Sequence, residues 1–205
     1  MFADREDAGK QLAEKLARYK SEDAVVLALP RGGVAVGYEI AQALKLPFDI
    51  VVVRKIGPPG NPEYAVCAVD EKGTRLCNEG EARKVDEKWL AEETERQRQE
   101  AVRRIKKYRG NRAPAALQGK TVIIVDDGIA TGLTMRLAVA AIKKQRPQKI
   151  IVAVPVAPLD AMRELRKEAE VVVLEPPEEF MGAVGAHYKN FPQVEDEEVI
   201  RLLNS

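Results

Sequence analysis

Several absences limit what this chain can be. Its 33 basic and 32 acidic residues nearly cancel, which argues against a general nucleic-acid or membrane-surface binder. No apolar run approaches the roughly 20 residues that a membrane-spanning helix needs. The first residues, MFADREDAGKQLAEKL, have mixed charges and lack the apolar centre of a signal peptide, so we expect no secretory signal. His187 is the one histidine, and without further histidine or paired cysteine ligands it predicts no zinc site.

Cysteine is scarce as well, because the chain contains only Cys67 and Cys77. The two residues flank an expected hairpin turn at 70–73. If the first and last residues of that turn face each other, Cys67 lies opposite Leu76 and its side chain points away from that of Cys77. We therefore expect two buried thiols in place of a disulfide. Such thiols indicate a reducing compartment, and we expect a cytoplasmic protein.

Short β-branched runs alternate with helical segments along much of the chain. This alternation predicts an α/β fold, a parallel twisted sheet of about five strands flanked by helices. The runs are almost continuously apolar, as strands buried on both faces should be. The expected core strands are Val25–Leu29, Ile50–Val53, Val122–Val125, Ile150–Val154 and Val171–Leu174, and the expected helices after them are Val34–Leu44, Leu133–Gln145 and Leu159–Lys167.

Two segments depart from this alternation within what we expect to be a single domain. The first contains a turn-rich loop, the hairpin and a very polar helix at about 81–108, which has only a thin apolar stripe. We expect that helix to lie on the core or on a partner subunit. The second is a tail whose Pro, Gly and aromatic residues suit an irregular hood. The predicted parts of the domain 1–205 are a core at about 22–56 and 117–175, an insertion at about 57–116 and a hood at about 176–194.

The segment TVIIVDDGIATGLT, residues 121–134, carries the strongest chemical signal. A buried strand ends in two carboxylates, Asp126 and Asp127, and a short loop then opens a helix. Open parallel sheets bind ligands beyond the carboxyl ends of their strands, and a helix N-terminus there suits a phosphate. The carboxylates would repel that phosphate unless they bind sugar hydroxyls, with a metal nearby. The spacing indicates ribose 5-phosphate, with its hydroxyls on the two acids and its phosphate on the loop residues Gly128, Ala130, Thr131, Gly132 and Thr134.

Residues 125–134 resemble the motif with which type I phosphoribosyltransferases bind the ribose donor PRPP. That motif has two apolar residues, two acids and three spacers before Thr-Gly-x-Thr. The resemblance covers residues 25–194 and is greatest to a group of bacterial phosphoribosyltransferase-domain proteins. It implies an enzyme that transfers ribose 5-phosphate from PRPP to a nitrogenous base or amine and releases pyrophosphate. It also implies a homodimer and Mg²⁺ as cofactor, held mainly through PRPP and near Asp126 and Asp127.

Two further segments match the family's pyrophosphate-binding parts. Arg31, Gly32 and Gly33 follow the first strand, where the family's loop contacts pyrophosphate, although a plain strand-to-helix turn would have the same residues. A cation with two glycines before a helix suits an anion. Arg54 and Lys55 end a buried strand, where two like charges are costly unless an anion binds. They resemble the basic pair that opens the family's flexible catalytic loop, and the following proline-rich loop 57–62 fits a mobile lid or an ordinary loop.

The resemblance places His187, Tyr188 and Phe191 in a hood over the acceptor. There the aromatic faces could stack on a base, or they could simply seal the hood against the core. The main alternative to an enzyme is a non-catalytic, PRPP-binding regulatory module. Regulators of this kind add a DNA-binding element, and this sequence contains neither a helix-turn-helix segment outside the core nor a basic patch.

Overall fold

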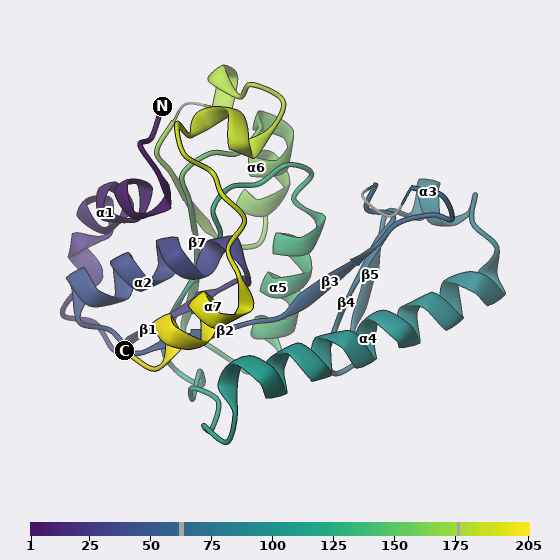
Figure 1. Cartoon of the computed structure of the whole chain (residues 1–205), viewed down its shortest axis with the longest axis horizontal. Helices are drawn as coiled ribbons and strands as arrows, with labels where there is room; N and C mark the ends of the chain where they lie inside the picture. The colour runs from purple at the N-terminus through teal and green to yellow at the C-terminus, as the bar shows by residue number, and fades with distance from the viewer. Residues whose placement is uncertain (62–63, 176) are drawn as a thin grey trace.

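The computed structural model describes residues 1–61, 64–175 and 177–205, and these form two sheets (Figure 1). The larger sheet has five strands in the order β2-β1-β6-β7-β8, and every neighbouring pair is parallel. This confirms the predicted α/β fold. The strands are β1 Ala24–Ala28, β2 Phe48–Ile50, β6 Thr121–Val125, β7 Lys149–Val154 and β8 Glu170–Val173.

Helices cover both faces of this sheet, with α1 and α2 on one side and α5 and α6 on the other (Figure 1). The strand pleat explains the division, because successive side chains point to opposite faces. In β6, Val122 and Ile124 pack with α5, whereas Ile123 packs with α1 and α2. The helices are α1 Arg5–Lys15, α2 Gly32–Leu44, α5 Leu133–Lys143 and α6 Leu159–Arg166.

A second, antiparallel sheet has the order β3-β4-β5 and projects from the core (Figure 1). Its strands are β3 Val53–Ile56, β4 Cys67–Asp70 and β5 Arg75–Cys77. The expected core strand at 50–53 is therefore divided, since β2 ends at Ile50 and β3 begins at Val53 in the other sheet. The apolar run is continuous across this point, so the sequence does not mark where the strand changes partners. The basic pair Arg54–Lys55 consequently lies within β3 and not at the end of a core strand.

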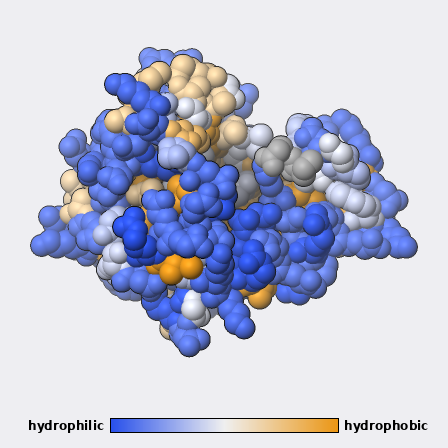
Figure 2. All heavy atoms as spheres, viewed as in Figure 1, coloured by the Kyte–Doolittle hydropathy of each residue, from blue (hydrophilic) through white to orange (hydrophobic). Residues whose placement is uncertain are grey.

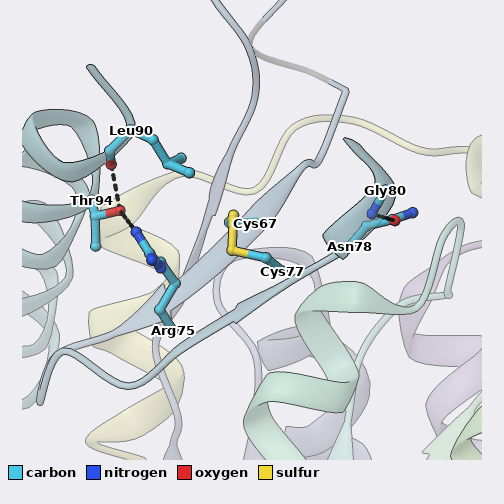
Figure 3. The surroundings of a disulfide bond; sticks show 7 residues. All are labelled: Cys67, Arg75, Cys77, Asn78, Gly80, Leu90 and Thr94. Atoms are coloured by element: carbon cyan, nitrogen blue, oxygen red, sulfur yellow. Dashed lines mark hydrogen bonds between the residues drawn. A yellow bond between two sulfur atoms is a disulfide. The ribbon is translucent and has the colours of Figure 1, made fainter. Parts of the chain in front are cut away.

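Cys67 and Cys77 lie directly opposite each other and form a disulfide (Figure 3). The prediction of two reduced thiols is wrong, because the hairpin loop has one more residue than we assumed. Asp70 pairs with Thr74, whose carbonyl accepts a hydrogen bond from the Asp70 N–H at 3.0 Å. Gly73 then takes a positive φ of 84°, which glycine adopts without strain. The one-residue shift brings both cysteines to the same face of the hairpin, and the argument for a reducing compartment loses its support.

The predicted polar helix consists of two helices, α3 Glu79–Ala82 and α4 Glu87–Arg109. They are separate because Asp86 caps α4, accepting a hydrogen bond from the Trp89 N–H at 2.8 Å. The expected apolar stripe is confirmed at Leu90, Ala101 and Tyr108, which are buried. It packs on β3, β4 and α7 (Asp196–Leu203) of the same chain. The face of α4 seen in Figure 2 is largely hydrophilic, and Val102 is an exposed apolar residue on this helix.

The described tail residues 177–194 have the irregular structure that was predicted, and their only helical elements are two short 3-10 turns, η2 Pro177–Glu179 and η3 Val184–His187. A third such turn, η1 Ala17–Tyr19, follows α1. Phe2 makes a parallel bridge to Tyr188, so the N-terminal segment lies along the hood. Pro62 in the predicted lid and residue 176 at the start of the predicted hood lie outside the described residues. Within the described residues, every helix is too short or too polar to cross a membrane.

Candidate functional site

A pocket lies at the carboxyl end of β6, where the chain passes from the central strand into α5. Its volume is about 160 Å³. It contains all five residues that the sequence assigned to a phosphate, together with one of the two acids and one cation. The lining residues are Lys55, Ala65, Asp126, Gly128, Ile129, Ala130, Thr131, Gly132, Thr134 and Met135. The structure thus brings together Asp126, the whole predicted phosphate loop and Lys55.

The loop between β6 and α5 is shaped by two glycines. Gly132 precedes the first residue of α5 with a φ of +79°, a conformation that other residues adopt only with strain. The N-cap residue Gly132 has no side chain to cap α5, so it leaves the first backbone N–H groups of the helix available to an anion. A Cβ at Gly128 would lie 2.4 Å from a methyl group of Val184. The hood therefore packs directly on this loop.

Asp126 is the acid that lines the pocket. Its Oδ1 accepts a hydrogen bond from the Asp127 backbone N–H at 2.8 Å. Burial, and then the neighbouring charge of Asp127, raise the pKa of Asp126 well above its usual value, while the charge of Arg5 opposes the shift. A cation or a hydrogen-bond donor that enters the pocket would therefore stabilise the ionised form of this carboxyl group.

Asp127 does not line this pocket but points toward the first residues of α2. Its Oδ2 accepts a hydrogen bond from Arg5 Nε at 2.8 Å. A Cβ at Gly32 would lie only 1.9 Å from that oxygen, and one at Gly33 would lie 2.8 Å from the Cα of Asp126. The two glycines that the sequence assigned to pyrophosphate are the first residues of α2, and their lack of a side chain lets the start of this helix pack against the acid pair.

Arg5 is the residue that the sequence reasoning missed. Its side chain is only 10% exposed. A signal was present, because Arg5 precedes Ala8 and Leu12 at the spacing of one helix face, and both of these are fully buried. A charged residue on a buried stripe needs a partner. The sequence did not show that the partner would be Asp127, 122 positions away.

The predicted pyrophosphate cations are separated in the structure. Lys55 faces the pocket, whereas the neighbouring Arg54 faces α4 and donates from Nε to the Gln97 Oε1 at 3.0 Å. Successive residues of a strand point to opposite faces, so both cannot reach one ligand from β3. Burial lowers the pKa of the Arg54 guanidinium. Arg31 lies near the carboxylate of Asp196, with 3.7 Å between the charged atoms, and does not line the pocket.

The three predicted hood residues differ in their accessibility. His187 is 1% exposed, pairs through Nδ1 with Glu175, and accepts a hydrogen bond at Nε2 from the Met181 N–H at 3.0 Å. Tyr188 is buried, and its hydroxyl donates to the backbone carbonyl of Asp127 at 2.6 Å. Burial raises the pKa of this phenol. Phe191 remains 36% exposed. The first two residues seal the hood against the core, and Phe191 is the one of the three with an accessible ring.

The comparison that decides the family is a match of residues 3–189 to the phosphoribosyl transferase domain. The chain belongs to the phosphoribosyltransferase family. This confirms the resemblance that the sequence motifs indicated. The family is one of transferases, and the five-stranded parallel sheet is the fold expected for its type I members.

A curated relative supports this membership, and two solved structures resemble the chain. A protein of Mycobacterium tuberculosis that is provisionally named a phosphoribosyl transferase is 41% identical over 207 residues, covering 100% of this chain and 46% of the relative. The chain thus spans about half the length of the curated relatives it matches. The crystal structure of TT1426 from Thermus thermophilus is 45% identical, with a TM-score of 0.83 over 99% of this chain and 97% of that one. A purine phosphoribosyltransferase from Pyrococcus horikoshii shows a remote likeness, with a TM-score of 0.45 at 19% identity over 82% of this chain and 85% of that one.

Proposed function

We propose that this phosphoribosyltransferase transfers ribose 5-phosphate from PRPP to a nitrogenous base or amine and releases pyrophosphate. One observation carries the proposal. Asp126, Lys55 and the loop that leads into the N-terminus of α5 line a single pocket. These groups complement the three parts of PRPP, since a carboxylate accepts hydrogen bonds from sugar hydroxyls, the helix N-terminus suits the 5-phosphate, and the cation suits the pyrophosphate.

The residues then have distinct roles in transfer. The bond from the anomeric carbon to pyrophosphate breaks with its electron pair on the departing oxygen, and the acceptor nitrogen bonds to the same carbon and releases a proton to solvent. Asp126 and Asp127 hold the ribose hydroxyls, and the loop from Gly128 to Thr134 holds the 5-phosphate. Lys55 stabilises the charge that develops on pyrophosphate, whereas Arg31, Gly32 and Gly33 lie outside this pocket and stay predicted pyrophosphate ligands. Catalysis of this kind depends on positioning and electrostatic stabilisation.

Magnesium fits this arrangement. Among residues 1–61, 64–175 and 177–205, no three histidine, cysteine or acidic side chains gather into a metal cage. Mg²⁺ is commonly bound through one or two carboxylates together with substrate phosphates. PRPP would therefore hold it through its own oxygens, with Asp126 and Asp127 nearby. When bound it would neutralise charge on the pyrophosphate. The homodimer and the cytoplasmic location stay predictions.

The test is pyrophosphate release from Mg²⁺-PRPP across a panel of free bases and simple amines. Asp126→Asn is the blank, because it keeps the size of the side chain and removes the carboxylate. We expect one acceptor to stimulate release by orders of magnitude over the blank. If PRPP binds without release for any acceptor, the chain is the regulatory module instead. If PRPP does not bind at all, the proposal is wrong.

Lys55 and Arg54 offer a matched pair for the pyrophosphate role. Lys55→Met and Arg54→Met each remove one positive charge from adjacent positions of β3, but only Lys55 lines the pocket. A charge-assisted contact contributes about 1.5–3 kcal/mol, so we expect Lys55→Met to weaken Mg²⁺-PRPP affinity about 10- to 100-fold. Arg54→Met should weaken it less than about threefold. Calorimetric titration measures both, and equal losses would contradict the assignment.

A further inference from the structure

Arg5 joins three segments that are far apart in the sequence. Its Nε donates to the Asp127 carboxylate at 2.8 Å, and its Nη1 donates to the backbone carbonyl of Pro192 at 2.7 Å. Its guanidinium carbon lies 3.7 Å from the centre of the Phe191 ring. The side chain thus contacts an acid of the donor site and the accessible ring of the hood at the same time. Both hydrogen bonds and the ring contact use the planar geometry that distinguishes arginine from lysine.

The backbone around Arg5 is held in place by the hood. The Phe2 N–H donates to the carbonyl of His187 at 2.8 Å, and the Lys189 N–H donates back to the carbonyl of Phe2 at 2.9 Å. The next residue of the hood, Asn190, donates from its N–H to the carbonyl of Ala3 at 3.0 Å. The segment that precedes Arg5 is therefore fixed along the hood by three backbone hydrogen bonds. Arg5 reaches Asp127 from a rigid position.

Asp127 is held from two directions by this arrangement. Arg5 holds its carboxylate, and the Tyr188 hydroxyl holds its backbone carbonyl at 2.6 Å. Its side chain is 16% exposed. A carboxylate can accept about four hydrogen bonds, so the contact with Arg5 leaves acceptor capacity for a sugar hydroxyl. Without Arg5, the acid pair would also present an unbalanced negative charge next to the phosphate loop.

We propose that Arg5 is a positioning residue, which orients the Asp127 carboxylate for the ribose hydroxyls and links it to the Phe191 ring of the hood. The inference rests on the proposed function, because it assumes that the acid pair binds ribose. Arg5 acts through Asp127 and need not touch the donor. A buried ion pair placed here for stability alone would gain little over apolar residues of the same size. Its position between the acid pair and the hood points to orientation instead.

The test compares the affinities for ribose 5-phosphate and inorganic phosphate, measured by calorimetry. Both ligands carry the same phosphate group to the α5 loop, and only the first carries hydroxyls to the acid pair. Arg5→Met should weaken ribose 5-phosphate binding about 10- to 100-fold, the factor for a lost charge-assisted contact. Phosphate affinity should change less than about threefold. Lys10→Met is the matched control, since Lys10 is an exposed cation of the same helix, and it should change neither.

Two further variants keep the outcome decisive. Arg5→Lys keeps the charge but lacks the planar fork that reaches Asp127 and Pro192 together, so it should restore only part of the affinity, and wild-type affinity in it would overturn the positioning role. In the Asp127→Asn background, Arg5→Met should cause no further loss beyond about twofold, because both residues act through one contact. Equal losses of ribose 5-phosphate and phosphate in Arg5→Met, or no loss, would also overturn the inference. If the wild-type chain binds no ribose 5-phosphate, the proposed function itself fails.

Discussion

Gly32→Ala tests the packing of the first turn of α2 against the acid pair. A Cβ at this position would lie 1.9 Å from Asp127 Oδ2, 2.6 Å from Asp127 Cγ and 3.2 Å from Arg5 Nε. The φ of Gly32 lies outside the region that favours glycine, so the substitution brings no backbone strain. Its main effect is therefore the collision of one methyl group with the carboxylate, which a helix-propensity gain of up to about 1 kcal/mol at this first residue of α2 offsets only in part. To relieve it, Asp127 must turn away from Arg5.

The size of the effect follows from these contacts. An extra methyl group in a well-packed place costs about 1–3 kcal/mol. Separating Asp127 from Arg5 adds to this, because their side chains are only 16% and 10% exposed and Arg5 would lose its partner. We expect the free energy of unfolding to fall by about 2–4 kcal/mol. For a chain of this length, each kcal/mol lowers Tm by about 2–4 °C. Binding of ribose 5-phosphate should weaken at least about tenfold, since Asp127 is displaced.

Gly80→Ala is the matched control for this prediction. It lies in the short helix α3, and the nearest atom to an added Cβ is Asn78 Oδ1 at 3.5 Å, an ordinary contact. Alanine is favoured over glycine in helices, so this variant should gain up to about 1 kcal/mol. Urea unfolding and calorimetric titration of both variants give the two readouts. If Gly32→Ala matches Gly80→Ala in stability and in ligand affinity, the geometry that we describe at the acid pair is wrong.

The disulfide and one acidic residue give two further predictions. Cys67 and Cys77 are 10 positions apart, and a disulfide that closes a loop of this length stabilises the folded state by about 3 kcal/mol. A dithiol should therefore lower the urea midpoint of the wild-type chain and have no effect on that of the control Cys77→Ser. An unchanged midpoint in both would show that the disulfide does not contribute to stability. Hydrogen bonds from Lys107 and Tyr108 lower the pKa of Asp196 from 3.8 to about 2. This contribution of up to about 2 kcal/mol is present above about pH 4 and is lost as the pH falls toward 2. Asp196→Asn should therefore be less stable than wild type at pH 7 and nearly equal at pH 2, and a stability difference that does not depend on pH would contradict this account.

The strands and the phosphate loop could be predicted from the sequence because they depend on local patterns. After Thr121, every residue of β6 is apolar, which is typical of a strand buried on both faces. The loop from Asp126 to Thr134 is continuous in the chain, so the backbone itself brings its members together. The same holds for the hood, where proline, glycine and aromatic residues predicted irregular structure. In each case neighbouring residues carry the whole signal.

Only the tertiary structure decided which side chains meet across the fold. Strand geometry requires Arg54 and Lys55 to point in opposite directions, but the packing of β3 between α4 and α5 selects Lys55 for the pocket. One extra loop residue set the hairpin register and paired the cysteines. Arg5 contacts Asp127 because α1 and the hood pack together at the carboxyl end of the sheet. These contacts join segments that are distant in sequence, and no local pattern of residues predicts which side chains of two distant segments come into contact.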